Sequence, residues 1–528
     1  MNLVDVLDKN SRLYPSDPAF VEVKPLSKER EEINWKQFSD RTSRLANALL
    51  HRKISKGDKV FLLGKNSINW IEAYFAVMKT GAWVVPLNFR FTDDDIEYCA
   101  KVAEPAAFIL ADEFGKRMNH IRSNLPTVKK YVSIGRESLG GMENMEDLIQ
   151  KSSPESPGVE LGDQDACGLY FTSGTTGAPK PVLVTHLNLM CAAISEATNH
   201  YLEQDDSLLM MPPLYHLAIG HLLGLMLVGG RTVLLTEKVG PKLIIENISG
   251  ECISVVFLLV PWALDLIEAL DKGVIKKKDH DLSSLRLTHM GAQPIPPSLV
   301  HRLKEYFPEM QYDTNYGLSE TAGPGPIHLG IENESKVGAI GKPAMMWDAR
   351  VVDFEGKDVA RGEVGEIVLK GSGVMKEYYK NPGLTSEAIR DGWLRTGDLA
   401  RTDDEGFIYL VDRKKDLVIC GGENIYPVEV EEIILRHPKV HDVAIIGIPD
   451  ERLGEIPIAV IEAKPDSNLA EDEINSFCDE NLPRFKRPRR IMFDHVPRNP
   501  TGKIEKPKLR EKFSPAALRV QSPSLPGN

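Results

Sequence analysis

Cysteine pairs, a basic excess and long hydrophobic runs are all missing from this chain of 528 residues, and each absence excludes a class of protein. The six cysteines form no Cys-x-x-Cys pair, which argues against a disulfide framework or a cysteine zinc site and favours a cytoplasmic protein with reduced thiols. The net charge of -12 argues against nucleic acid or an anionic membrane as the main partner. The most apolar stretch, 253–270, is interrupted by Pro261, Asp265 and Glu268. It predicts a buried strand leading into a helix, without an integral membrane segment.

Short apolar runs alternate with helical patterns along most of the chain. Strands are expected at 59–63, 82–87, 107–110, 207–211, 231–235 and 254–260, and a helix at 70–79. This alternation predicts the α/β class with largely parallel, buried strands. The polar segment 140–164 is expected to be a surface excursion, and 362–370 and 406–411 to be strands of a smaller β subdomain.

The pattern restarts after a charged stretch at 412–415. A helix at 428–437 and strands at 442–446 and 457–462 are expected there, followed by a helix ending near Pro483 that Asn468 and Glu471 would cap. A chain of this length exceeds a single core. We therefore expect a large N-terminal domain of stacked α/β subdomains with a β subdomain at 1–411. A hinge at 412–415 and a small mobile α+β domain at 416–513 would follow, and 514–528 is expected to be disordered.

The stretch 170–186 has the composition of a phosphate-binding loop. Glycines permit the positive φ angles that turn successive backbone N–H groups toward one point, hydroxyls add donors, and a lysine adds a compact positive charge. No Gly-Lys-Ser/Thr element closes a Walker A frame, and apolar flanks at 167–171 and 182–184 predict that the loop joins two strands. Its candidate ligands to a polyphosphate are Thr172, Ser173, Gly174, Thr175, Thr176, Gly177 and Lys180.

Five motifs in order resemble the signatures of the adenylate-forming superfamily, which includes acyl-CoA synthetases, luciferases and peptide-synthetase adenylation domains. The first is the phosphate loop. The others are Tyr316-Gly317-Leu318-Ser319-Glu320, Trp393 to Asp398, Asp412 to Pro427 with its Gly421-Gly422 pair, and Pro500-Thr501-Gly502-Lys503-Ile504. The resemblance covers roughly the last two-thirds of the chain.

The resemblance implies a nucleotide site and a role for each matching residue. Glu320 would be a Mg²⁺ ligand, since a carboxylate beside phosphates needs a cation between them. Ser319 would donate to the α-phosphate, and Tyr316 would face adenine. Asp398 would accept from the ribose hydroxyls, and Arg413 would reach the ribose or the phosphates. Lys503 would bridge the substrate carboxylate and the α-phosphate. The remaining nucleotide candidates are Gly291, Ala292, Gln293, Asn315 and Gly317.

Further residues are assigned to the acid, to CoA and to the hinge. His216, in a motif that resembles the opening of the acyl pocket, would orient the substrate carboxylate or be a structural histidine. Gly220 and Gly224 would leave room for the acyl group or serve close helix packing. Lys415 is the hinge candidate, and the CoA candidates are Gly421, Gly422, Arg90, Arg484 and Lys486. Pro181 replaces the usual glycine after Lys180 and removes one backbone N–H, either from a phosphate contact or from the start of a strand.

The resemblance implies a carboxylic acid–CoA ligase that uses ATP, CoA and Mg²⁺. An acyl-adenylate forms with release of pyrophosphate, and the CoA thiol then displaces AMP; both steps are reversible. The alternatives are an adenylation enzyme that serves a carrier protein, a luciferase-like enzyme, and a non-enzymatic binding protein. No acidic residue near 211–225 matches an amino-acid substrate, so a medium-chain, aromatic or alicyclic acid is favoured over a polar one. A homo-oligomer is left open.

Overall fold

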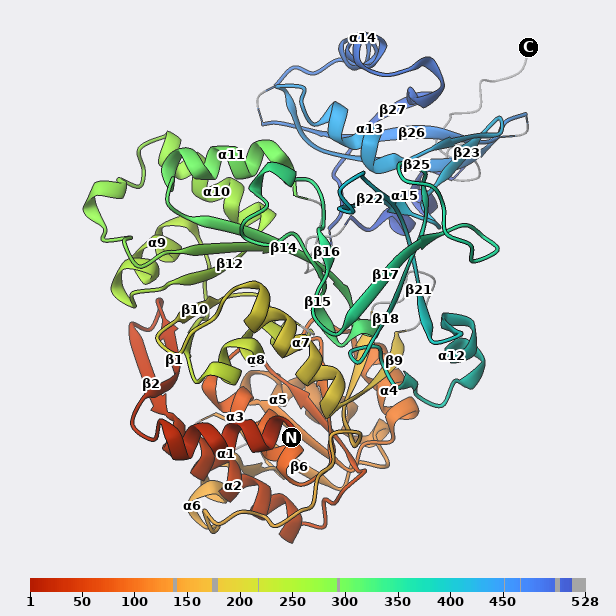
Figure 1. The fold of residues 1–528 in the computed structure, drawn as a ribbon. Helices are drawn as coiled ribbons and strands as arrows, with labels where there is room; N and C mark the ends of the chain where they lie inside the picture. Colours follow the sequence, from red (N-terminus) through yellow and green to blue (C-terminus); the bar gives the residue numbers. More distant parts are fainter. Residues whose placement is uncertain are drawn as a thin grey trace, which may run out of the picture. The chain divides into compact units, whose positions relative to one another are not determined.

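The computed structural model describes residues 1–135, 140–172, 179–216, 218–291, 295–450, 452–465, 467–498 and 504–514. The chain divides into two compact units (Figure 1). The first comprises 1–291, 297–349 and 369–394, and the second 292–296, 350–368 and 395–528. None of the helices described has both the length and the apolar composition that a membrane crossing needs.

The first unit contains two large sheets that are parallel at their centres, as the alternating pattern predicts. One sheet has the order β16 (Lys342–Pro343), β15 (Gly323–His328), β14 (Gln311–Leu318), β13 (Leu287–Gly291), β12 (Val255–Leu259), β10 (Ser207–Met210), β11 (Arg231–Leu235), β1 (Pro18–Lys24), β2 (Glu29–Asn34). The other has the order β19 (Glu377–Tyr378), β9 (Lys180–Thr185), β8 (Ala166–Thr172), β4 (Trp83–Leu87), β3 (Lys59–Leu63), β5 (Ala107–Ala111), β6 (Lys130–Ile134), β7 (Glu143–Asn144).

The helices of this unit cover the sheets. They are α1 (Leu3–Leu13), α2 (Trp35–His51), α3 (Ile68–Lys79), α4 (Asp93–Ala103), α5 (Gly115–Ile121), α6 (Met145–Gln150), α7 (His186–Asn199), α8 (Ile219–Val228), α9 (Pro241–Gly250), α10 (Val260–Asp271), α11 (Pro297–Tyr306) and α12 (Pro382–Ala388). The expected strand-to-helix passage at 253–270 is confirmed as β12 and α10, with Pro261 in the first turn of the helix, where a missing N–H costs nothing.

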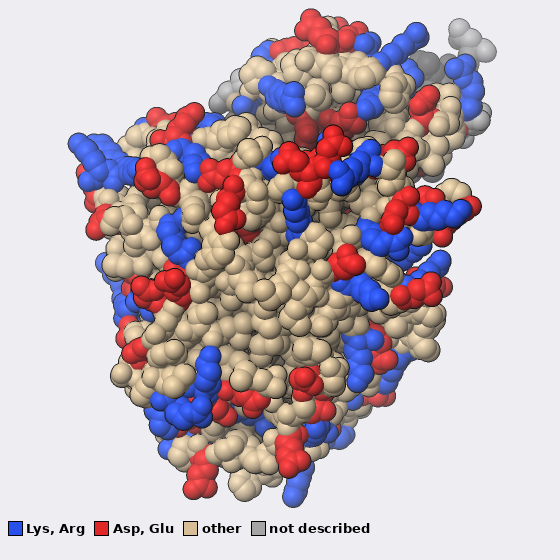
Figure 2. Space-filling view, viewed as in Figure 1, with Lys and Arg blue, Asp and Glu red and all other residues tan. Residues whose placement is uncertain are grey.

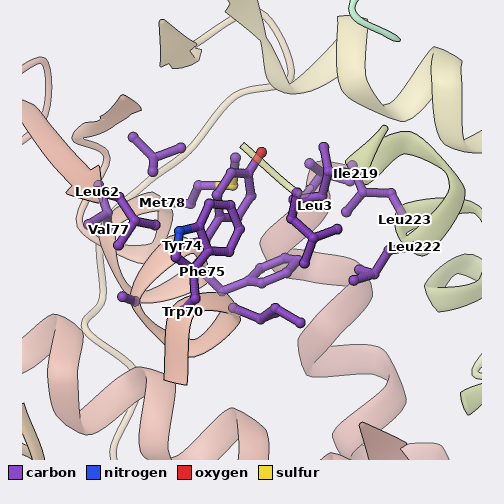
Figure 3. Close-up of a cluster of buried hydrophobic side chains, with 14 of the residues drawn as sticks. Leu3, Leu62, Trp70, Tyr74, Phe75, Val77, Met78, Ile219, Leu222 and Leu223 are labelled. Carbon is purple, nitrogen blue, oxygen red and sulfur yellow. The ribbon is translucent and has the colours of Figure 1, made fainter. Parts of the chain in front are cut away.

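One apolar cluster joins both sheets through the helices. Trp70, Tyr74 and Phe75 of α3 pack with Leu3 of α1 and with residues of α8 (Figure 3). Strand residues of both sheets, such as Leu62 and Leu208, belong to the same cluster. Because α3 is buried on every side, apolar residues occupy most of its circumference instead of one stripe, and its buried Glu72 pairs with Arg41.

Two smaller sheets complete the chain. One has the order β17 (Trp347–Val352), β18 (Gly365–Gly371), β21 (Trp393–Thr402), β20 (Ile389–Arg390), with β22 (Ile408–Arg413) paired to β21. The other, in the second unit, has the order β24 (Glu423–Ile425), β23 (Val418–Cys420), β26 (Gly454–Ala463), β25 (Val440–Asp450), with β27 (Arg490–Phe493) paired to β26. Helices α13 (Pro427–Ile434), α14 (Glu471–Asn481) and α15 (Lys506–Lys512) accompany it, so the expected α+β unit is present.

Two local expectations are wrong. The segment 140–164 is not only a surface excursion, because it holds β7 and α6, and Met145, Leu148 and Ile149 of α6 are buried. The helix after Asn468 begins at Glu471, two residues later than a cap at Asn468 requires. Its N-cap is Ala470, which has no side-chain oxygen to accept a backbone hydrogen bond.

Candidate functional site

The phosphate loop joins two antiparallel strands, as its apolar flanks predict. Thr172 at the end of β8 lies opposite Lys180 at the start of β9. The loop residues Ser173, Gly174, Thr175, Thr176 and Gly177 lie outside the described residues, as do Ala292, Gln293 and Lys503. Their roles remain predictions.

Pro181 is the second residue of β9. Its carbonyl accepts a hydrogen bond of 2.8 Å from the backbone N–H of Tyr379, on the side of β9 that faces β19. In an antiparallel strand the N and the carbonyl of one residue face the same neighbour. An N–H at residue 181 would therefore face β19, so its absence removes no hydrogen bond between β8 and β9. Pro181 lies at the start of a strand, which is one of the two positions considered for it.

Lys180 and Glu320 are connected through a tyrosine that sequence reasoning missed. The Tyr378 hydroxyl donates a hydrogen bond of 2.6 Å to Glu320 Oε1, and Lys180 Nζ lies 5.5 Å from the centre of the Tyr378 ring. Burial and the Glu320 charge raise the pKa of Tyr378, so its hydroxyl stays a donor at neutral pH. No local pattern marks Tyr378, because its position depends on the pairing of β19 with β9.

The turn that carries Glu320 is held by its backbone. Residues 319–321 form a short 3-10 turn between β14 and β15, and the Met375 N–H donates a hydrogen bond of 2.8 Å to the Glu320 carbonyl. A Cβ on Gly317 would lie 2.2 Å from the Gly323 carbonyl oxygen, so only glycine fits there. Tyr316 is buried and Ser319 is half-buried.

The CoA candidate Arg90 and the carboxylate candidate His216 lie at the two ends of a row of aromatic side chains. The Arg90 guanidinium lies 5.8 Å from the Phe89 ring, Phe89 lies 5.3 Å from Tyr215, and Tyr215 lies 4.3 Å from His216. The structure therefore brings the predicted CoA residue Arg90 near the predicted carboxylate residue His216. Gly224 serves helix packing, because a Cβ on it would lie 2.7 Å from Cβ of Glu196 in α7.

A second group of predicted residues lies in the second unit. Asp398 in β21 and Arg413 in β22 are directly opposite, and Arg413 Nε donates to Asp398 Oδ1 at 3.2 Å. The neighbouring Asp412 accepts from the N–H groups of Arg413 and Val428 at 2.7 and 2.9 Å. Burial raises the pKa of Asp412 to about 6. Asp398 and Arg413 therefore contact each other, and their role at the ribose remains a prediction. The hinge candidate Lys415 is exposed on the turn that follows β22.

The CoA candidates of the second unit have structural partners of their own. Gly421 and Gly422, with φ of 61° and 89°, form the two-residue turn between β23 and β24, which requires positive φ at both positions. Lys486 pairs with Glu429 at 2.5 Å, and Arg484 is exposed. Their contact with CoA remains a prediction.

Comparison with known proteins decides the family. The AMP-binding enzyme model matches residues 7–379, and the AMP-binding enzyme C-terminal domain matches 429–503. The chain belongs to the AMP-binding enzymes. It is 34% identical to a feruloyl-CoA synthase of Amycolatopsis, over 91% of this chain and 94% of that protein. It is 31% identical to a long-chain-fatty-acid–CoA ligase of Mycobacterium tuberculosis, over 97% and 99%.

Solved structures agree with this assignment. The anthranilate CoA ligase AuaEII in complex with anthranoyl-AMP has a TM-score of 0.88 and 27% identity and covers 98% of both chains. The o-succinylbenzoate CoA synthetase of Bacillus subtilis with ATP and magnesium has a TM-score of 0.83 and 26% identity, over 96% of this chain and 99% of that one. This AMP-binding enzyme is an ATP-dependent acid–CoA ligase that acts through an acyl-adenylate, and the resemblance seen in the motifs is confirmed.

Proposed function

We propose that this ligase activates an apolar monocarboxylic acid, with an aromatic acid as the first candidate. The relatives include enzymes named for feruloyl and 2-succinylbenzoate substrates, and a structural neighbour holds an anthranoyl-adenylate. A fatty acid is the alternative, supported by the long-chain relative. We propose the cytoplasm as its location, because all six cysteines are free thiols, which fits a reducing compartment.

The contact between Lys180, Tyr378 and Glu320 is the observation that carries the nucleotide chemistry. Lys180 would neutralise the leaving pyrophosphate. The Tyr378 hydroxyl fixes Glu320 Oε1, so Glu320 Oε2 would be the oxygen offered to the metal. A carboxylate oxygen is the ligand type that Mg²⁺ prefers, so Glu320 fits the expected metal. When bound, Mg²⁺ would supply charge neutralisation at the phosphates.

Positioning and electrostatics account for the remaining roles. Asp398 and Arg413 would hold the ribose, His216 would orient the substrate carboxylate, and Lys503 would bridge that carboxylate and the α-phosphate. Gly421, Gly422, Arg484, Lys486 and Arg90 are proposed contacts of CoA. Residues 412–415 are the proposed hinge between domains 1–411 and 416–513.

Amino acids are expected to be poor substrates. The buried carboxylates beside α8, Glu196 and Asp313, already face Asn315 and several imidazoles, so neither is free for a substrate ammonium group. Burying an unpaired ammonium costs several kcal/mol or more, at least about a hundredfold in affinity.

The test is a panel of acids assayed for pyrophosphate exchange and for CoA-dependent AMP release. Aromatic, fatty and alicyclic monocarboxylates should be compared with amino acids at equal concentration. We expect activity with an apolar acid and thioester formation only when CoA is present. Strong exchange with an amino acid, and none with the other classes, would overturn the proposal.

A further inference from the structure

Six ionisable side chains are buried together behind Asn315, and the ligation chemistry uses none of them. They come from five elements and are at most 4% exposed. Buried charged groups are rare unless they are paired or coordinate a metal. The members of this cluster are Glu196 of α7, His200 at the C-cap of α7, His221 of α8, His289 of β13, Asp313 of β14 and His328 of β15.

Hydrogen bonds explain one half of the cluster. Asp313 Oδ2 accepts from His200 Nε2 and His328 Nδ1, both at 2.8 Å, and its Oδ1 accepts from the Gly330 N–H at 2.8 Å. These bonds place a proton on His200 Nε2 and on His328 Nδ1. The other ring nitrogen of each histidine, His200 Nδ1 and His328 Nε2, faces Glu196 at 3.4 and 3.6 Å.

In the half around Glu196, several polar atoms have no hydrogen-bond partner among the described residues. Glu196 Oε1 accepts from Asn315 Nδ2 at 2.7 Å, whereas Oε2 has no aligned donor among the described residues, although His221 Nδ1 lies 2.6 Å away. His328 Nε2 and both ring nitrogens of His289 also lack a hydrogen-bond partner in the described part of the chain. Buried polar atoms in native proteins are nearly always satisfied, so these atoms are candidate ligands for a bound ion or water.

We propose that a zinc ion binds here, held by Glu196 Oε2, His200 Nδ1 and His221 Nδ1. Bond lengths of about 2.0–2.1 Å place the ligand atoms of a tetrahedral zinc about 3.3 Å apart. The 3.4 Å between Glu196 Oε2 and His200 Nδ1 already matches this spacing. The 2.6 Å between Glu196 Oε2 and His221 Nδ1 must widen by a small side-chain rotation.

The surroundings also have the features of a metal site. Asp313 accepts the outer N–H of His200, the arrangement in which a carboxylate orients a histidine ligand. A dication would balance the two buried carboxylates. A cavity of about 10 Å³, which is room for about one water, is bounded by His200, His221 and His289 and otherwise by apolar side chains. The fourth position could be taken by His289 or by a water in this cavity.

The close packing of α7 on α8 explains how the ligands meet. Gly224, one turn after His221, allows α8 to approach Glu196, since a Cβ there would lie 2.7 Å from the Glu196 Cβ. The zinc therefore joins the two helices under β13 and β14. Its expected role is structural, since it would hold α7 against α8.

Metal analysis of the full chain, purified without a histidine tag, tests the site. We expect about one zinc per chain in protein prepared with zinc present, and a visible absorption typical of tetrahedral cobalt after exchange with Co²⁺. X-ray absorption at the zinc edge should give nitrogen and oxygen neighbours at about 2.0–2.1 Å. Less than a tenth of an equivalent, or a sulfur shell, overturns the proposal and leaves the cluster balanced by imidazolium protons.

Variants locate the ion. His221→Gln and Glu196→Gln should each lose at least nine-tenths of the bound zinc, while His301→Gln, at an exposed position of α11, should keep it. A chelator should lower the melting temperature of the wild-type chain and leave that of His221→Gln unchanged. Retention of zinc by both ligand variants overturns the assignment. If neither variant folds, the wild-type absorption data decide, and the acid–CoA ligase assay is scored separately.

Discussion

At the scale of single residues, the Tyr378 hydroxyl fixes the carboxylate next to the phosphate loop. A hydrogen bond to a charged group contributes about 1.5–3 kcal/mol, so its loss is expected to slow adenylate formation about tenfold or more. We predict that Tyr378→Phe has this effect and also raises the Mg²⁺ concentration needed for half-maximal rate. Steady-state assays across a magnesium titration measure both.

Tyr379→Phe is the matched control, since the adjacent ring contacts Trp83 and Lys59 while its hydroxyl has no hydrogen bond among the described residues. It should behave as wild type. If Tyr378→Phe lowers only the melting temperature and leaves the magnesium requirement unchanged, the tyrosine is structural and does not position Glu320.

Lys503 is predicted to act in adenylate formation alone. We expect Lys503→Ala to slow that step about a hundredfold or more, which is what losing one preorganised charge stabiliser costs. Thioester formation from supplied acyl-adenylate should be much less affected, because no cation is then needed between carboxylate and α-phosphate. Equal losses in both half-reactions, together with a lower melting temperature, would indicate that Lys503 only stabilises its domain.

At the scale of elements, the contact between α7 and α8 depends on Gly224. Alanine is favoured over glycine in a helix by about 1 kcal/mol, but overpacking costs about 1–3 kcal/mol. Because the added Cβ would also lie 3.2 Å from the Ala193 carbonyl oxygen, we expect the cost to exceed the gain, and we predict that Gly224→Ala lowers the free energy of unfolding by up to about 2 kcal/mol. Urea denaturation measures it.

Gly250→Ala is the control for this change. Gly250 is the last residue of α9, and a Cβ there has no neighbour within 4 Å among the described residues. We expect its stability to equal or slightly exceed that of wild type. A similar loss in both variants would mean that helix packing is not the cause.

His186, the first residue of α7, makes stability depend on pH. Burial lowers its pKa from 6.5 to about 4, so on acidification the unfolded chain takes up the proton first. Stability from this group is complete above pH 6.5 and is lost as pH falls toward 4. Each pKa unit is worth about 1.4 kcal/mol. Between pH 7 and 5, the free energy of unfolding of the wild type should fall by about 2 kcal/mol more than that of His186→Gln. If urea denaturation shows the same fall for both proteins, this prediction is wrong.

The sequence predicts local elements well and contacts between distant elements poorly. Strands such as β3 and β11 are long apolar runs and agree with the expected residues 59–63 and 231–235. Helix α6 was missed because a short apolar face in a polar segment gives little periodicity. Tyr378 and the buried histidines carry no local signal, since strand pairing and helix packing bring them to their partners.

At the scale of the whole molecule, charge and motifs are consistent with an enzyme of small anionic substrates. Acidic and basic side chains are interspersed on the face in Figure 2, so a net charge of -12 coexists with local cations. Such cations are needed because ATP and CoA are themselves anionic. Of the motif residues, those around Lys180 and Glu320 belong to the first unit and Asp398, Arg413 and Lys415 to the second.

The hinge proposed at Lys415 can be tested by measuring the two half-reactions separately. Lys415 lies exposed in the turn after β22, and among the described residues its backbone N–H donates no hydrogen bond, so proline there removes none. Proline restricts φ, which a pivot at this residue must change. We predict that Lys415→Pro leaves adenylate formation within about threefold of wild type and slows thioester formation at least tenfold. Single-turnover assays of each half-reaction measure this.

Lys415→Ala separates the backbone from the side chain. It keeps the freedom of φ, so both half-reactions should stay near wild type if the backbone pivots at Lys415. Lys503→Ala should give the reverse pattern of Lys415→Pro, with adenylation lost and thioester formation retained. The opposite effects of the two variants are decisive, because a general loss of stability would lower the rates of adenylate and thioester formation together in either variant. Equal losses in both steps for Lys415→Pro would therefore place the hinge elsewhere in the chain.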